Sequence, residues 1–158
     1  MSRSLGAALP ADLLALLSQH DLAPLLGRGI PLVTLGADGR PHPMLCSYLE
    51  LLAMSGTALR LAIAVRSRSA ANLQSQGVGT FLLVEPERSV YLKCRAVGPP
   101  RVVFGNLARF ELTVEDVLED APMEAEGPAR ITSGITYAPA PDLDAPWVKA
   151  LLAALRAT

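Results

Sequence analysis

Four consecutive residues, Arg-Ser-Arg-Ser at positions 66–69, combine the side chains that proteins use to hold a phosphate group. Guanidinium groups supply positive charge and can bind two phosphate oxygens at once. The residues at positions 70–74, Ala-Ala-Asn-Leu-Gln, favour a helix that has Ser67 or Ser69 as its N-cap. Because the first N–H groups of a helix have no acceptor within the helix, they attract an anion. The segment therefore predicts a phosphate site at the start of a helix.

An apolar run positions this segment. Residues 61–65, Leu-Ala-Ile-Ala-Val, have the length and the β-branched content of a buried strand. A strand that leads into a basic helix start fits two interpretations. One is a phosphate site, and the other is a serine-capped helix flanked by solvated arginines. These residues alone favour the serine-capped helix with solvated arginines. The choice between the two interpretations therefore depends on the surrounding elements.

Strand patterns alternate with turn signals along most of the chain. The Asp38-Gly39 pair lies between two apolar runs and predicts a hairpin. Pro41 and Pro43 have no amide hydrogen, so the start of the next strand is expected at a sheet edge. Only one helix interrupts these strands, which favours a mostly antiparallel barrel over a parallel sheet. The expected strands cover residues 30–35, 41–54, 58–65, 80–84, 89–96 and 101–112.

Helical patterns flank these strands at both ends of a single expected domain. An amphipathic helix over residues 10–19 and a short helical segment over 21–29 are expected to lid one end of the barrel. After the barrel, which is expected over residues 30–112, the acidic residues 113–120 suggest a short helix and residues 121–127 a loop. Residues 130–137 fit a last strand or an ordered arm. A helix over 147–155 is expected to close the chain, with Trp147 as a packing anchor.

The order and spacing of these features resemble those of the FMN-binding split β-barrel proteins, of which pyridoxamine 5′-phosphate oxidase is the best-known member. The resemblance covers residues 25–98 and includes the Ala-Asp-Gly-Arg-Pro turn at 37–41, the Ser-Gly hairpin at 55–56 and the pattern S-x-S-x-x-N-L at 67–73. It implies a mostly β fold with flanking helices, built as a six- to seven-stranded antiparallel split β-barrel. It further implies a homodimer that holds FMN in a groove between its subunits.

The resemblance also implies roles for individual residues. The phosphate and ribityl chain of FMN would be held by Arg66, Ser67, Arg68, Ser69 and Asn72. The flavin ring would lie against Pro43, Met44, Leu45 and Cys46 in the long strand and against Val65 at the end of the strand that precedes the junction. Many members of the family carry Lys where Ser69 stands here, and Arg66 and Arg68 would supply the positive charge instead.

The resemblance implies an oxidoreductase that acts on a small molecule. The His and Arg signature with which the true oxidase binds pyridoxal phosphate is not recognisable near the C-terminus, so that particular activity is not expected. Two alternatives stay open. The same groove could hold another planar cofactor, such as the deazaflavin coenzyme or haem, or the chain could be a cofactor-free dimer with a binding or structural role.

Composition limits the remaining classes of protein. The chain has 158 residues, of which 51% are hydrophobic, and its net charge of −1 gives no signature for nucleic acid binding. The longest apolar region, residues 49–65, is interrupted by Glu50 and Arg60 and predicts no membrane span. No signal peptide is apparent, so a cytoplasmic location is expected. The excess of apolar residues instead favours a surface that is buried in an oligomer.

The cysteines and the distribution of charged residues lead to further expectations about redox state and ligand charge. Cys46 and Cys94 both lie in strand patterns and are expected to be reduced and unpaired, and no Cys/His cluster has the spacing of a zinc site. Residues 1–110 hold eleven basic residues against six acidic ones, a net charge of +5 that would suit an anionic ligand. Residues 111–126 hold seven acidic residues and no basic one. This acidic run is interpreted as a solvated face.

Overall fold

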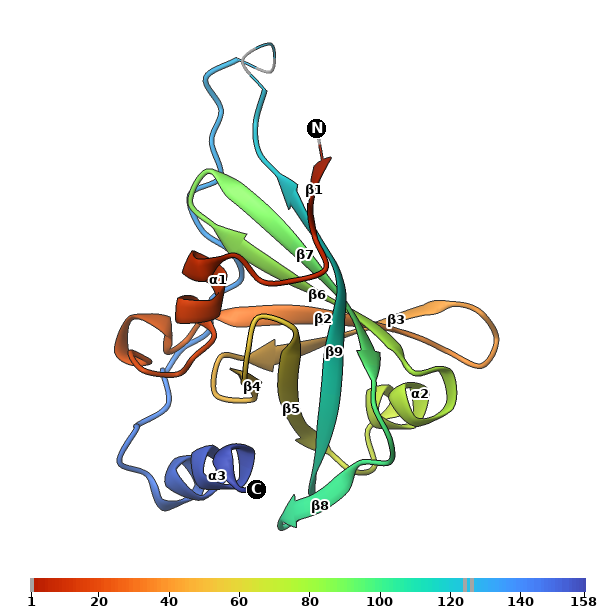
Figure 1. Ribbon diagram of the computed structural model, residues 1–158. Coiled ribbons are helices and arrows are strands. Elements are labelled where there is room, and N and C mark those ends of the chain that lie inside the picture. The colour runs from red at the N-terminus through yellow and green to blue at the C-terminus, as the bar shows by residue number, and fades with distance from the viewer. Residues whose placement is uncertain (1, 124, 126) are drawn as a thin grey trace.

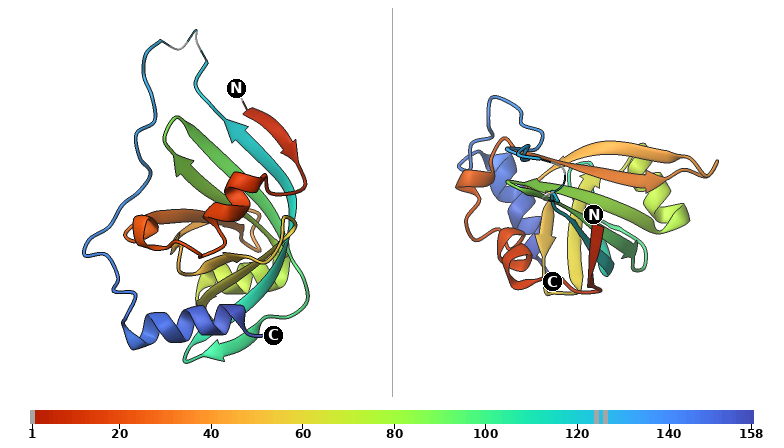
Figure 2. Two further views of the ribbon diagram at one scale, coloured as in Figure 1. Left: turned by 60° about the vertical axis from the view of Figure 1, so that its left-hand side comes forward. Right: turned by 90° about the horizontal axis from the view of Figure 1, so that it is seen from above.

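The computed structural model describes residues 2–123, 125 and 127–158. Within them, nine strands form one sheet that curls into a half-barrel, and every strand pair is antiparallel (Figures 1 and 2). The strands are β1 (Ser2–Gly6), β2 (Gly29–Leu35), β3 (Pro41–Ser47), β4 (Leu51–Ala53), β5 (Ala58–Ala64), β6 (Val78–Glu85), β7 (Arg88–Ala96), β8 (Arg101–Phe104) and β9 (Leu107–Asp120). The helices are α1 (Ala11–Leu16), the 3-10 turn η1 (Ala23–Leu25), α2 (Arg68–Gln76) and α3 (Pro146–Arg156).

The strands follow the order β3-β2-β6-β7-β9-β5-β4, with β1 and β8 added to β9. The long strand β9 holds the sheet together, because it pairs with β5, β7, β1 and β8 along its length. Strands β3 and β4 lie at the two ends of the path. The start of β3 therefore lies at a sheet edge, as its two prolines predicted.

Alternation of side chains builds the core. In β2 the residues Ile30, Leu32 and Thr34 point inward, whereas their neighbours in the chain are only half-buried. Phe81 of β6 pairs with Leu32 on one side and with Leu92 of β7 on the other, and all three are fully buried. This period of two is typical of strands that bury one face against a core.

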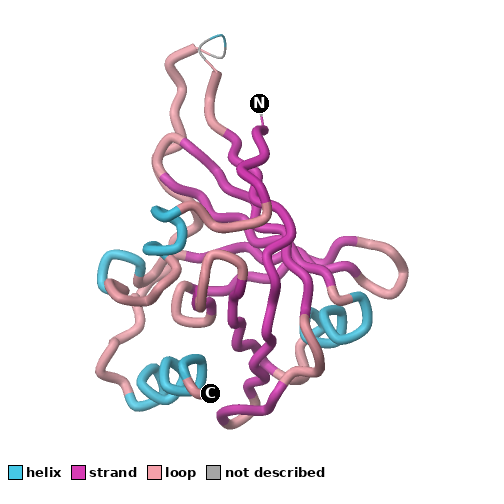
Figure 3. The backbone as a smooth tube through the Cα atoms, viewed as in Figure 1, coloured by secondary structure: helices cyan, strands magenta, loops and turns pink. Residues whose placement is uncertain are grey.

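The helices pack around the sheet at separate places (Figures 1 and 3). Helix α2 packs against β2, β3 and β6, and α3 packs against β5 and β8. The N-terminal helix α1 is shorter than expected, and β1 before it was not anticipated. Gln19 fastens the segment after α1 to the β3–β4 turn, since its side-chain amide lies 3.1–3.2 Å from the carbonyl oxygens of Tyr48, Leu49 and Leu51.

The expected single strand over residues 41–54 is wrong, because the chain turns between β3 and β4. One carboxylate oxygen of Glu50 accepts hydrogen bonds from the backbone N–H of Ser47 at 2.7 Å and from its hydroxyl at 2.9 Å. The Glu50 N–H also donates to the Ser47 carbonyl at 3.1 Å. These bonds close a turn that separates the two strands.

The strand expected over residues 101–112 is two strands, β8 and β9, joined at Gly105-Asn106. Gly105 has a φ of +53°, which suits a glycine in a tight turn.

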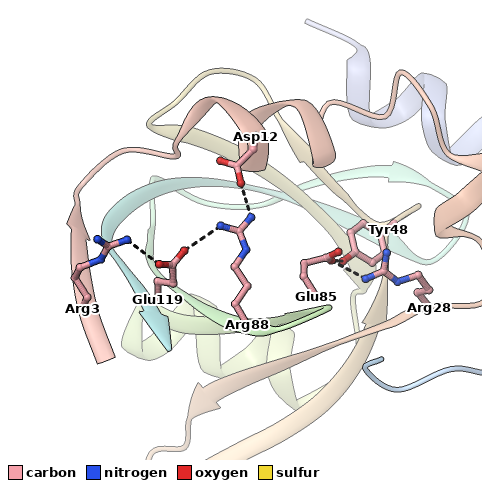
Figure 4. A network of polar contacts seen from close by, with 7 residues as sticks. All are labelled: Arg3, Asp12, Arg28, Tyr48, Glu85, Arg88 and Glu119. Carbon is pink, nitrogen blue, oxygen red and sulfur yellow. Dashed lines mark hydrogen bonds and ion pairs between the residues drawn. The ribbon is translucent and has the colours of Figure 1, made fainter. Parts of the chain in front are cut away.

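The short acidic helix expected over residues 113–120 is also wrong, because this segment continues β9. Its acidic side chains meet basic ones on the neighbouring strands: Asp116 pairs with Lys93 at 3.3 Å and Glu115 pairs with Arg95. Glu119 lies between Arg3 of β1 at 2.8 Å and Arg88 of β7 at 2.9 Å (Figure 4). The part of the acidic run that lies in β9 is thus largely ion-paired across strands, and is not merely a solvated face.

The C-terminal part of the chain returns along the sheet. Residues 130–137 form an arm rather than a strand, with hydrogen bonds from Glu87 N–H to the Ile131 carbonyl at 2.9 Å and from Gly29 N–H to the Ile135 carbonyl at 2.8 Å. The expected helix at the end of the chain is confirmed as α3. The loop expected over residues 121–127 includes positions 124 and 126, which lie outside the described residues.

Arg109 of β9 and Arg60 of β5 hold the C-terminal end of α3. Arg109 is 3% exposed and donates to the carbonyls of Ala154 at 3.0 Å and Ala157 at 2.6 Å. Arg60 donates to the carbonyls of Leu155 and Ala157, both at 2.8 Å. Positive charge at a helix C-terminus also complements the helix dipole. Among the described residues, no helix has both the length and the apolar character needed to cross a bilayer.

Candidate functional site

Helix α2 begins where the sequence predicted. Ser67 is its N-cap, and the Ser67 hydroxyl oxygen accepts a hydrogen bond from Ala70 N–H at 3.1 Å. Gly77 ends the helix in the left-handed conformation, with a φ of +72°. The N–H groups of Arg68 and Ser69, in the first turn, have no acceptor within the helix. The helix start therefore offers two backbone donors to a ligand.

A cavity of about 580 Å³ lies against this helix start. One wall is the helix and the residues just before it: Arg66, Ser67, Arg68, Ala71 and Asn72. The opposite wall is the β2–β3 turn, residues 36–38, which the sequence analysis had identified as a hairpin but not as part of the site. The turn contributes one acidic side chain, that of Asp38, which lies 3.9 Å from Arg40.

The two arginines of the helix wall have no partner within the described residues. Both Arg66 and Arg68 are exposed, and neither forms a hydrogen bond or an ion pair there. Of the other twelve basic residues, eleven contact a carboxylate or a backbone carbonyl in the described part of the chain, and the exception is Arg101 of β8. Two unpaired guanidinium groups therefore meet at one cavity.

Asn72 ties the helix to the sheet. It is buried, and its side-chain amide donates to the Thr34 hydroxyl of β2 at 3.0 Å. The Thr34 hydroxyl in turn donates to the His42 carbonyl of β3 at 3.3 Å. Through these two bonds Asn72 fixes α2 against both strands of the hairpin that forms the opposite wall. Asn72 was predicted at the site from the sequence, whereas Thr34 was not, because its only signal is its inward position in β2.

Ser69 differs from the other predicted phosphate residues. Its side chain is 1% exposed, its hydroxyl has no hydrogen-bond partner, and it does not line the cavity. The reason is helical geometry, since Ser69 points toward the core, as its buried neighbour Ala70 does. Only the backbone N–H of Ser69 remains available to a ligand at the helix start.

The four residues predicted to meet a flavin ring alternate across β3. Pro43 and Leu45 point away from the core, and Leu45 is 47% exposed. Met44 is half-buried and Cys46 is buried, because adjacent side chains in a strand point to opposite faces. Val65 follows β5, is half-buried, and donates its N–H to the Asn106 carbonyl at 2.7 Å. Only Pro43 and Leu45 thus offer side chains on the outer face.

The two thiols are held as structural groups. Cys46 and Cys94 are both free and buried. Burial raises the pKa of the Cys46 thiol, and the nearby Glu50 carboxylate raises it further. Burial likewise raises the pKa of Cys94 to about 12, with a smaller contribution from Glu115. Neither thiol is a thiolate nucleophile at neutral pH.

Solved structures share this fold. A proposed pyridoxamine 5′-phosphate oxidase from Lactobacillus delbrueckii has a TM-score of 0.55 at 14% identity, over 73% of this chain and 98% of that chain. An FMN-binding protein from Syntrophomonas wolfei has a TM-score of 0.55 at 10% identity, over 71% of this chain and 89% of that one. A variant of HupZ from Group A Streptococcus has a TM-score of 0.51 at 12% identity, over 64% and 98%.

These matches confirm the fold that the sequence resemblance predicted. The chain has the split-barrel fold of the pyridoxamine 5′-phosphate oxidase-like proteins. No protein-family model matches the sequence, and no curated protein matches it. Weaker structural matches, with TM-scores below 0.5, include an F420 reductase and the haem storage protein HutZ from Vibrio cholerae, and they support no assignment. Likeness of fold does not choose a cofactor.

Proposed function

We propose that the chain is a homodimeric flavoprotein that binds FMN, with the phosphate held in the cavity at the start of α2. The observation that carries this proposal is the pair Arg66 and Arg68, which lack partners in the described residues and line one cavity with a helix N-terminus. Guanidinium groups that have no carboxylate partner are available to a dianionic phosphate. The expected class of reaction is oxidoreduction of a small molecule.

Each residue has a separate part in binding. Arg66 and Arg68 would neutralise the phosphate, and the N–H groups of Arg68 and Ser69 would donate to its oxygens. Asn72 would keep the helix in place through its hydrogen bond to Thr34. FMN supplies the redox chemistry when it is bound, and the protein supplies binding and orientation. Asp38, on the opposite wall, would weaken phosphate binding by repulsion.

The flavin ring would lie along the outer face of β3. Pro41 and Pro43 have no backbone N–H, so this sheet edge lacks hydrogen-bond donors at two positions. Pro43 and Leu45 present apolar surface next to the hairpin turn that forms the cavity wall. A flat apolar ring can cover such surface without competing for strand hydrogen bonds. The proposal therefore uses Met44 and Cys46 only through their backbone.

The homodimer is proposed because apolar surface remains uncovered on the outside of the sheet. The outward side chains of β2, β3 and β6 include Pro31, Val33, Leu45 and Leu82, all half-buried or exposed. A continuous apolar face of this kind suits an interface between copies of the chain. Analytical ultracentrifugation at micromolar concentration should give a dimer, and a stable monomer with full cofactor content would contradict it.

A pair of matched substitutions tests the phosphate site. Arg68→Ala should weaken FMN binding about tenfold to a hundredfold, because a hydrogen bond to a charged group is worth roughly 1.5–3 kcal/mol. Arg101→Ala removes an equally exposed and unpaired charge that lies outside the cavity, so it should leave the affinity nearly unchanged. Flavin-fluorescence titrations at two ionic strengths measure both variants. Equal losses that fade together at high salt would reject the site.

A further inference from the structure

A second cavity lies against α3, and it is lined by residues of α3, the β3–β4 turn and the β8–β9 turn. Its volume is about 430 Å³, within the range of small-molecule sites. Three segments far apart in sequence enclose it: the β3–β4 turn, the β8–β9 turn and the start of α3 with the arm before it. It shares no lining residue with the cavity at the start of α2.

Three aromatic side chains converge on this cavity. Phe104 is 41% exposed, Tyr137 is 37% exposed and Trp147 is 50% exposed, although the chain has only seven aromatic residues. The other four are buried or half-buried. Trp147 was expected to be a packing anchor, but half of its surface is open. Uncovered aromatic faces gathered at one hollow are a feature of binding sites rather than of solvated surface.

Among the described residues that line the cavity, Glu50 alone carries a charge. Its Oε2 atom accepts the two hydrogen bonds from Ser47, whereas Oε1 has no hydrogen bond and no basic partner within the described residues. By contrast, Glu85, Glu111 and Glu119 each pair with an arginine. Burial raises the pKa of Glu50, although the bonds from Ser47 act in the opposite direction. The half-buried Glu50 side chain therefore lines the cavity with one carboxyl oxygen that has no partner in the described residues.

We propose that this cavity binds a small organic cation, an aromatic or heteroaromatic molecule that carries a protonated amine. The amine N–H groups would donate to Oε1 of Glu50, and the aromatic side chains would cover the apolar body of the ligand. Aromatic faces also attract a cation directly. A carboxylate that is partly removed from water gains from a cationic partner, and such a ligand provides the pairing charge. This site uses no residue of the proposed FMN phosphate site.

Trp147 provides the readout, because it is the only tryptophan in the chain and lines the cavity. The probes are 2-phenylethylamine, the neutral 2-phenylethanol and the anionic phenylacetate, which share a ring and differ in charge. When the amine is titrated into the purified 158-residue chain, it should change the Trp147 emission saturably. It should bind at least tenfold more tightly than the alcohol, and phenylacetate should bind most weakly. Equal affinities for the amine and the alcohol would overturn the proposal.

Two substitutions sharpen the test. Glu50→Gln should weaken binding of the amine at least tenfold and leave the alcohol nearly unchanged, while Glu87→Gln, in the exposed β6–β7 turn, should change neither. Phe104→Ala, at an exposed position, should weaken both probes and keeps the test valid if Glu50→Gln does not fold. Unchanged amine binding in Glu50→Gln that folds would also overturn the proposal.

A second copy of the chain is the rival occupant of the cavity. If it covers the aromatic side chains, acrylamide quenching of Trp147 should rise as the protein is diluted, and none of the probes should bind. That result would overturn the proposal and assign the surface to an interface. Quenching that is independent of protein concentration and falls only when the amine is added supports the proposal.

Discussion

Arginines serve different purposes in two regions of this molecule. Near the β6–β7 turn, Arg88 lies between Asp12 and Glu119 (Figure 4). Arg28 pairs with Glu85 at 2.6 Å, and its guanidinium lies over the Tyr48 ring at 5.2 Å from the ring centroid. At the start of α2, Arg66 and Arg68 have no such partner among the described residues. Charges of the first kind stabilise the fold, and charges of the second kind are free for a ligand.

The largest expected effect separates the two kinds of arginine. The double substitution Arg66→Ala/Arg68→Ala removes two hydrogen bonds to a charged group, worth roughly 3–6 kcal/mol together, so FMN affinity should fall about a hundredfold to ten-thousandfold. Stability should change by less than about 0.5 kcal/mol, because both side chains are exposed and unpaired. Flavin titration and urea unfolding measure the two quantities. A large loss of stability would show that these arginines are structural.

The converse substitution is Arg109→Ala. This substitution removes a buried side chain that donates to two carbonyls at the end of α3. The Nε atom of Arg109 also lies 3.0 Å from Glu111, in an ion pair whose geometry does not form a hydrogen bond. We expect a loss of about 3 kcal/mol in the free energy of unfolding. Urea unfolding followed by circular dichroism measures it, with Arg101→Ala as the exposed control. Similar unfolding midpoints for both variants would contradict the structural role of Arg109.

The paired network should also make stability depend on pH. Hydrogen bonds from Arg88 hold the pKa of Asp12 and of Glu119 below their ordinary values of 3.8 and 4.5. A carboxyl whose pKa is lower in the folded state stabilises the protein above its unfolded pKa, and this contribution is lost as the pH falls through the folded pKa. Unfolding midpoints should therefore fall below about pH 4.5.

Arg88→Ala should reduce this acid dependence and cost about 1 kcal/mol at neutral pH, a modest value because Asp12 is 55% exposed and its pair with Arg88 is screened. Urea unfolding at pH 7 and pH 3 measures both quantities. An unchanged difference between the two pH values in Arg88→Ala would show that other carboxyls cause the acid dependence.

The smallest expected effect concerns the acidic side chain of the cavity. Asp38→Asn keeps the shape of the β2–β3 turn and removes a negative charge from the wall that faces Arg66 and Arg68. FMN binding should tighten about two- to fivefold at low salt, and the gain should shrink at high salt. Fluorescence titration detects the change, and Asp142→Asn, outside the cavity, is the control. Weaker binding in Asp38→Asn would show that Asp38 helps to bind the ligand.

Local patterns were sufficient to predict much of the fold. Apolar runs bounded by turn signals predicted β2, β6 and β7, and Ser67 predicted the start of α2, because these signals depend on neighbours in the chain. The acidic segment at 113–120 was misjudged as a helix because charged residues suit both the surface of a helix and a paired strand. The deciding contacts, with Lys93 and Arg95 of β7, depend on strand pairing.

The two cavities could likewise be predicted only where their lining residues are neighbours in the chain. The helix wall at the start of α2 could be read from the sequence, since Arg66, Ser67 and Arg68 are adjacent. The opposite wall at Asp38 could not be predicted, because the hairpin turn lies next to the helix only once the sheet has folded. The cavity under α3 had no local signal at all, since Glu50, Phe104 and Trp147 come from three distant segments.

The central claim is that the unpaired arginines at the start of α2 hold FMN. Mass spectrometry of the small molecule released when the purified protein is denatured tests it most directly, carried out on the unsubstituted chain, on Arg66→Ala/Arg68→Ala and on Arg101→Ala. We expect FMN from the unsubstituted chain and from Arg101→Ala, and little or none from the double variant. Release of haem or a deazaflavin, no small molecule from any of the three, or full retention of FMN in the double variant would contradict the claim.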